Sequence, residues 1–181
     1  MGKGDFIVTY TGVRFYVLNP SPDDINERDI AHALSLMCRG NGHLYHFYSV
    51  AQHCLNCYYE AVARGYSKRL RLALLLHDAS EAYISDITRP VKKNLPQYCE
   101  LEKSIQECVY KHFGLDDLTD DELETIKEID DNMLCIEFKD NHIYKNFEMK
   151  SQMQAQLVLD FVNMEEIEKR FLKAFEECQN D

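Results

Sequence analysis

A histidine and an aspartate stand side by side at the end of an apolar run, in the stretch LLLHDASEAYISD at residues 74–86. Adjacent residues on a helix point about 100° apart, so His77 and Asp78 cannot both face a dry core. Glu81 and Asp86 follow closely and add two more carboxylates. Because uncompensated charge is costly to bury, this stretch predicts that a cation is held inside the fold.

Apolar residues recur at helical spacing through most of the chain, which predicts an all-α helical bundle. β-branched and aromatic residues around Thr11 and Gly12 predict one exception, a small N-terminal β-hairpin at about residues 5–18. Expected helices cover residues 25–38, 48–64, 67–77, 96–112, 119–136 and 151–178. Ser67 is a candidate cap, and Thr119 with Glu122 forms a capping box.

Length and charge narrow the functional classes. A chain of 181 residues with 45% hydrophobic content predicts one domain, with a metal-binding core at about residues 26–140. The formal charge of −11 argues against a nucleic acid polymer as partner. No apolar segment approaches the roughly 18–20 residues that span a bilayer, and no signal peptide is recognisable. We therefore expect a cytoplasmic protein without a membrane partner, with its seven cysteines reduced.

Imidazole and carboxylate together suit a divalent transition metal, and further ligands have to come from other helices. His53 in SVAQH and Asp130 in IKEIDDNML are polar residues on otherwise apolar helical segments. The apolar positions around Asp130 favour it over its neighbour Asp131, although periodicity separates the two only weakly. Cys54 and Cys57 form CLNC inside an expected helix, without a second pair, so packing is the preferred interpretation over a zinc site.

The order His53, His77-Asp78, Asp130 resembles that of the HD-domain metal-dependent phosphohydrolases. The resemblance extends from about residue 29 to residue 137, through DIAHALS, RGNGH, YSVAQH, LLLHDASEAYISDITRPVK and IKEIDDNMLCIE. The chain is most similar to the branch that includes bacterial 5′-deoxynucleotidases and related nucleotide triphosphohydrolases. That resemblance implies a helical fold and one divalent metal ion (Mn, Co, Mg, Zn, Fe or Ni) held by those four residues. Members are often homodimers, so we expect a homodimer.

The resemblance also implies roles for individual residues. Glu81 matches the catalytic carboxylate of the family, Asp86 a second acid that helps to place water or sugar, and Arg39 a residue that meets the substrate phosphate. The structural alternatives are a charge at a helix N-terminus, a loop cap and a surface ion pair, respectively. Lys92 is a candidate substrate-binding residue, and with Lys93 it would add positive potential near the mouth of the site. Lysines, however, are more often solvated surface residues.

One departure limits what can be transferred. Related sequences often carry a tryptophan after the arginine, where it helps to select the sugar, but here the residue is Gly40 and the chain contains no tryptophan. Sugar and base specificity therefore do not carry over.

The expected function is metal-dependent hydrolysis of a nucleotide phosphoester, namely of a nucleoside 5′-monophosphate to nucleoside and phosphate. A divalent cation makes water more acidic and withdraws charge from a phosphoryl oxygen, while Glu81 would protonate the departing sugar oxygen or steer the water. Two alternatives remain. One is a (deoxy)nucleoside triphosphate triphosphohydrolase, and the other is a non-catalytic nucleotide-binding module that kept the metal cage.

Overall fold

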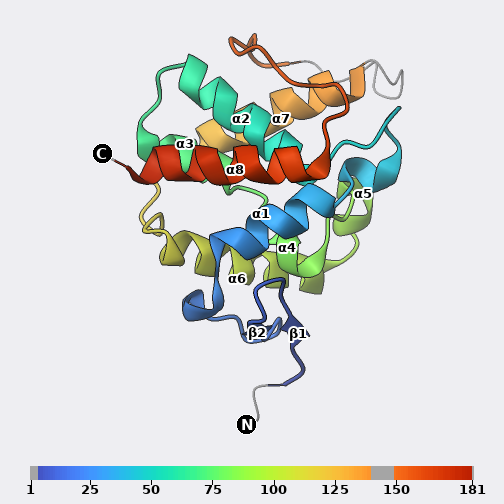
Figure 1. Cartoon of the computed structure of the whole chain (residues 1–181), viewed down its shortest axis with the longest axis vertical. Helices are drawn as coiled ribbons and strands as arrows, with labels where there is room; N and C mark the ends of the chain where they lie inside the picture. Colours follow the sequence, from blue (N-terminus) through green and yellow to red (C-terminus); the bar gives the residue numbers. More distant parts are fainter. Residues whose placement is uncertain (1–3, 140–148, 181) are drawn as a thin grey trace.

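Helices make up most of the computed structural model, which describes residues 4–139 and 149–180 (Figure 1). In chain order the elements are β1 (Ile7–Val8), β2 (Arg14–Phe15), η1 (Pro22–Asp24), α1 (Glu27–Leu36), η2 (Arg39–Gly42), α2 (Val50–Ala63), α3 (Lys68–Leu75), α4 (Glu81–Ile84), α5 (Arg89–Lys92), α6 (Pro96–His112), α7 (Asp120–Lys139) and α8 (Met164–Gln179). The prediction of an all-α fold with a small N-terminal hairpin is confirmed. In the described parts of the chain, no helix is both long and apolar enough to cross a membrane.

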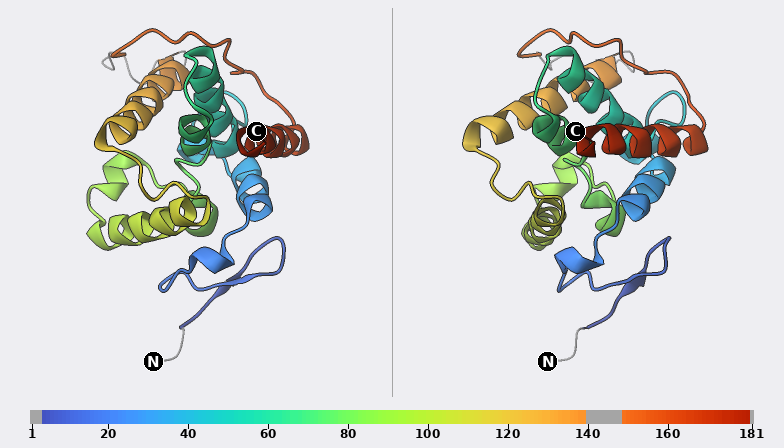
Figure 2. Two further views of the ribbon diagram at one scale, coloured as in Figure 1. Left: turned by 90° about the vertical axis from the view of Figure 1, so that its left-hand side faces the viewer. Right: turned by 60° about the vertical axis from the view of Figure 1, so that its left-hand side comes forward.

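The core forms around α2, which is buried along almost its whole length. α3, α7 and α8 pack against α2, and α8 also covers α1 and α3. The hairpin lies at the opposite end of the molecule from α2 and α7 (Figures 1 and 2). Phe15 anchors it, because its buried ring stacks on Tyr83 with the ring centroids 4.0 Å apart.

Helix starts follow the local signals. The Ser67 hydroxyl accepts a hydrogen bond from the Leu70 amide at 3.2 Å, and α6 has Pro96 in its first turn. Thr119 and Glu122 bond reciprocally at the start of α7, at 2.9 and 3.2 Å, as a capping box requires. These predictions are confirmed.

The predicted helix at residues 151–178 is wrong in its first half, because α8 begins only at Met164. Three buried polar residues one turn apart on α2 explain this: Gln52, Asn56 and Glu60. Gln52 and Asn56 donate to the Val158 carbonyl at 3.0 and 2.9 Å, while Glu60 accepts from the backbone amides of residues 154 and 155, each at 2.8 Å. Side chains of α2 thus satisfy backbone groups that a helix would otherwise pair internally.

Candidate metal centre

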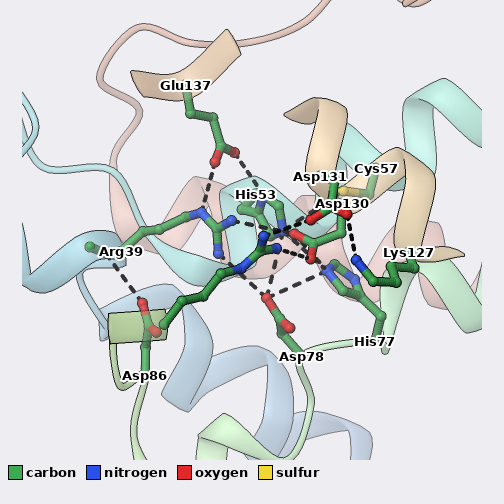
Figure 3. Close-up of polar contacts among 12 residues, drawn as sticks. Arg39, His53, Cys57, His77, Asp78, Asp86, Lys127, Asp130, Asp131 and Glu137 are labelled. Atoms are coloured by element: carbon green, nitrogen blue, oxygen red, sulfur yellow. Dashed lines mark hydrogen bonds and ion pairs between the residues drawn. The ribbon is translucent and has the colours of Figure 1, made fainter. Parts of the chain in front are cut away.

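The four predicted metal ligands meet at one point in the structure (Figure 3). His53 comes from α2, His77 and Asp78 from the turn after α3, and Asp130 from α7. Nε2 of His53 lies 3.1 Å from Nε2 of His77, 3.3 Å from Oδ1 of Asp130 and 3.6 Å from Oδ2 of Asp78. Nε2 of His77 lies 3.4 Å from that Asp78 oxygen and 3.9 Å from that Asp130 oxygen. Residues far apart in the sequence therefore present their donor atoms to one another.

The spacing of these donors fits a small divalent cation. For a tetrahedral site with bonds of about 2.0–2.2 Å, neighbouring ligand atoms lie about 3.4 Å apart. A thiol lies close by as well, since Cys57 Sγ is 3.8 Å from Nε2 of His53. The ligand atoms of His53, Cys57 and His77 all lie within 4.8 Å of one another, and Asp78 belongs to a second such group with Cys54 and His77. These residues could hold a metal ion.

The second ring nitrogen of each histidine has an acceptor as its partner. Nδ1 of His77 donates to the Leu74 carbonyl at 2.7 Å, and Nδ1 of His53 lies 2.7 Å from a carboxylate oxygen of Glu137. With the proton on Nδ1, the lone pair of Nε2 points to the other donors, and an acceptor at Nδ1 is what usually orients a metal-binding histidine. The sequence analysis missed this role of Glu137. A usable signal existed, because Glu137 lies two helical turns after Asp130 on the same face of α7.

Glu137→Gln is expected to weaken metal binding by about 10–100-fold, the usual cost of losing the hydrogen-bond partner that orients a metal-binding histidine. The carboxylate is buried and also accepts from the Tyr48 hydroxyl at 2.9 Å and from Nε of Arg39 at 2.7 Å. Calorimetric titration with Mn²⁺ measures the change. Tyr48→Phe is the matched control, since it removes one hydrogen bond from Glu137 but leaves the contact with His53. Equal affinities of Glu137→Gln and wild type would contradict the assignment.

Arg39, the predicted phosphate-binding residue, is only 7% exposed, so a surface ion pair does not describe it. Its guanidinium lies 3.5 Å from Asp78, 3.6 Å from Asp130 and 2.7 Å from Glu137. Its backbone amide donates to the Tyr48 carbonyl at 2.8 Å, which fixes the start of the η2 turn. The structure thus places a permanent cation beside the candidate ligands.

A cavity of about 760 Å³ adjoins these donors. Its charged lining consists of the basic residues Arg39, Arg89, Lys92 and Lys93 and the acids Asp78, Glu81, Asp86 and Asp130. Ile87, Leu134 and Phe138 supply apolar wall. Every predicted substrate or catalytic residue therefore lies around one cavity.

Glu81 does not lie on a continuation of the helix that precedes His77. Helix α3 ends at Leu75, and Glu81 is the first residue of a separate helix, α4. Its side chain is buried, and Lys92 Nζ lies 3.4 Å from Oε1. Among the described residues, Oε2 has no hydrogen-bond partner. Burial, followed by the negative charges of Asp78 and Asp86, raises the pKa of the Glu81 carboxyl well above its usual range. The shift favours the protonated carboxyl, which is the form that a general acid requires.

Asp86 and Gly40 both line the cavity and contact each other. Oδ2 of Asp86 accepts from the Gly40 amide at 3.2 Å, so this acid holds the η2 turn in place. Gly40 has φ of 60°, and a Cβ there would lie 2.7 Å from the ring of Phe138. A tryptophan therefore does not fit at position 40 beside this phenylalanine, and Phe138 occupies the wall instead. The ring of Phe138 thus gives a steric reason for glycine instead of tryptophan at position 40.

Lys92 and Arg89 complete the basic lining. Lys92 pairs with Glu102 at 2.5 Å as well as with Glu81, so it is not a solvated surface residue. Arg89, which the sequence analysis missed, contacts Asp130 at 2.9 Å and Asp131 at 2.6 Å. Its signal was a further basic residue in the ISDITRPVK segment. The choice of Asp130 over Asp131 also has a geometric basis, because it is Asp130 that lies beside the histidines.

Metal affinity is expected to rise with pH. Burial lowers the pKa of His77, but Asp78, Cys54 and Asp130 together more than offset this and raise that pKa well above its ordinary value. A proton therefore competes with a cation for the imidazole, and raising the pH removes the competitor. Below the raised pKa, the apparent affinity should increase by about tenfold per pH unit for each proton displaced. Mn²⁺ titrations between about pH 6 and 8 test this, and a flat profile would contradict it.

Comparison with known proteins identifies relatives, but the names of these relatives do not state an activity. No family model matches the chain. It is 42% identical over 110 residues to the uncharacterized protein YfdR of Escherichia coli (strain K12), a match that covers 61% of the chain and 59% of YfdR. It is 41% identical over 111 residues to the uncharacterized protein RCAP_rcc00048 of Rhodobacter capsulatus, covering 58% of the chain and 56% of that protein. The chain thus matches less than two thirds of the length of these relatives, and membership of the HD-domain family stays a prediction.

Proposed function

We propose that this protein is an HD-type, metal-dependent phosphohydrolase that releases phosphate from a nucleoside 5′-monophosphate. One observation carries the proposal. Two imidazole nitrogens and two carboxylate oxygens, with separations of 3.1–3.9 Å for the pairs that include a histidine, lie beside a cavity whose lining includes Glu81 and several basic side chains. Metal donors, a candidate acid and phosphate-binding cations in one place are the parts that phosphoester hydrolysis needs.

His53, His77, Asp78 and Asp130 would hold the cation. Mixed imidazole and carboxylate ligands suit Mn²⁺, Fe²⁺, Co²⁺, Ni²⁺ or Zn²⁺ better than an all-oxygen site would. When bound, a divalent cation supplies a Lewis acid for a phosphoryl oxygen and makes water a better nucleophile at neutral pH.

The protein side chains would divide the remaining work. Arg39 and Arg89 offer fixed positive charge to the nonbridging phosphate oxygens, on which charge accumulates in the transition state. Water forms the new bond to phosphorus as the bond to the sugar oxygen breaks. Glu81, whose raised pKa favours the protonated form, would give its proton to that oxygen and could regain one from the attacking water. No covalent enzyme intermediate is required.

The cavity suits a nucleotide in size and in lining. Its volume of about 760 Å³ falls in the range of small-molecule sites. With the phosphate beside the donors, sugar and base would contact the apolar wall that includes Leu134 and Phe138.

Product analysis tests the proposal. The protein is incubated with nucleoside mono-, di- and triphosphates, each with added Mn²⁺, Co²⁺, Mg²⁺ or Zn²⁺, and the products are identified. Orthophosphate and nucleoside from a monophosphate support the proposal. Tripolyphosphate as the product would show a triphosphohydrolase instead. Nucleotide binding without turnover under every condition would indicate a non-catalytic binding module. The homodimer stays a prediction, and analytical ultracentrifugation tests it by measuring the mass of the protein in solution.

A further inference from the structure

Two cysteine thiols are buried directly behind the imidazole donors. Cys54 and Cys57 are fully buried on α2 and form no disulfide. Sγ of Cys57 lies 3.8 Å from Nε2 of His53, the same nitrogen that faces the two carboxylates. Figure 3 labels Cys57 and draws its sulfur in yellow. The carboxylates of Asp78 and Asp130 line the cavity, whereas the thiols do not.

The thiol of Cys57 is placed as a ligand would be. In a tetrahedral site with one sulfur bond of about 2.3 Å and one nitrogen bond of about 2.1 Å, sulfur and nitrogen lie about 3.6 Å apart. The observed 3.8 Å is close to that value. His77 completes the group, since the ligand atoms of His53, Cys57 and His77 all lie within 4.8 Å of one another.

We infer that His53 and His77 can bind two kinds of cation, and that Cys57 is a ligand for only one of the two kinds. A thiophilic ion such as Cd²⁺ takes His53, His77 and the Cys57 thiolate as ligands. Mn²⁺ or Mg²⁺, which prefers oxygen to sulfur, takes the imidazoles with Asp78 and Asp130. This inference rests on the proposed metal centre and specifies how that centre responds to different metals.

The consequence is selective inhibition. When Cys57 binds, its thiol proton is released to solvent and one metal–sulfur bond forms. With Cys57 as a ligand the ion is held on the buried side of the imidazoles, away from the cavity that Asp78 and Asp130 line, whereas catalysis needs a position open to water or substrate. A thiophilic ion would therefore occupy the imidazoles and block hydrolysis, and an oxygen-preferring ion would support it.

Cobalt spectroscopy tests the ligand directly, without an activity assay. The whole protein is titrated with Co²⁺, which gives visible bands in any tetrahedral site and a near-ultraviolet charge-transfer band only with a thiolate ligand. We expect both features in the wild type, and only the visible bands in Cys57→Ser and Cys57→Ala. Cys108→Ser, on α6, is the matched control and should keep both. Cd²⁺ affinity should fall by about tenfold or more in the Cys57 variants, while Mn²⁺ affinity changes by less than about twofold.

The outcomes separate the two proposals. Visible bands without a charge-transfer band in the wild type would overturn the role of Cys57 and leave the nitrogen–oxygen centre intact. A charge-transfer band that persists in both Cys57 variants would assign the sulfur to another cysteine and overturn the inference. Failure of the wild type to bind Co²⁺, Mn²⁺ or Cd²⁺ would remove the proposed metal centre itself. Circular dichroism of each variant establishes that it is folded.

Discussion

His77→Ala is expected to lose metal binding and turnover together. Nε2 of His77 lies 3.1 Å from that of His53 and 3.4 Å from Asp78, so the substitution removes a donor from the middle of the cluster. Losing a residue that only orients a ligand costs about 10–100-fold in metal affinity, and losing a ligand itself should cost more, about 1,000-fold. Calorimetric titration with Mn²⁺ and a phosphate-release assay at saturating nucleotide measure the two effects.

A second histidine serves as the control. His112, on α6, has an exposed ring that bonds the Pro22 carbonyl at 2.7 Å and lies outside the cavity, so His112→Ala should keep both metal and turnover. Thermal unfolding of the two variants shows whether any loss comes from the fold. Wild-type Mn²⁺ affinity in a folded His77→Ala protein would remove His77 from the metal centre.

Helix periodicity predicts the parts of this fold whose faces are buried against other helices. α2, α6 and α7 lie where their apolar spacing placed them, and the capping box at Thr119 sets the start of α7. The segment at residues 151–163 shows the limit of that argument. Leu157 packs against the core from irregular chain, because Gln52, Asn56 and Glu60 of α2 bind the backbone there. Those partners lie about a hundred residues earlier in the chain and leave no local signal.

The same limit applies to the candidate site. His53, His77-Asp78 and Asp130 were found from their order along the chain, which needs no knowledge of packing. Glu137, Arg89 and the thiol of Cys57 were not assigned to the site, because their positions depend on how α7, α5 and α2 meet. The CLNC motif was interpreted as packing, and both cysteines are indeed buried, but burial alone does not show which atom a thiol faces.

Glu81→Gln is expected to keep the metal and lose turnover. The amide has nearly the same shape as the carboxyl but cannot transfer a proton, and a well-placed general acid contributes about 10²–10⁴ in rate. Mn²⁺ affinity should stay close to the wild-type value, because none of the close donor contacts involves Glu81. Single-turnover hydrolysis measures the rate, and calorimetry measures the binding.

The pH profile of the same variant distinguishes proton transfer from a merely structural role. Burial raises the pKa of Glu81, and a general acid must be protonated to act, so wild-type turnover should fall as the pH rises through that pKa. In Glu81→Gln the residual rate should lack this alkaline decline. Glu124→Gln, at an exposed position on α7, should retain both the rate and the profile of the wild type. A Glu81→Gln protein with wild-type turnover would show that the sugar oxygen receives its proton from another group.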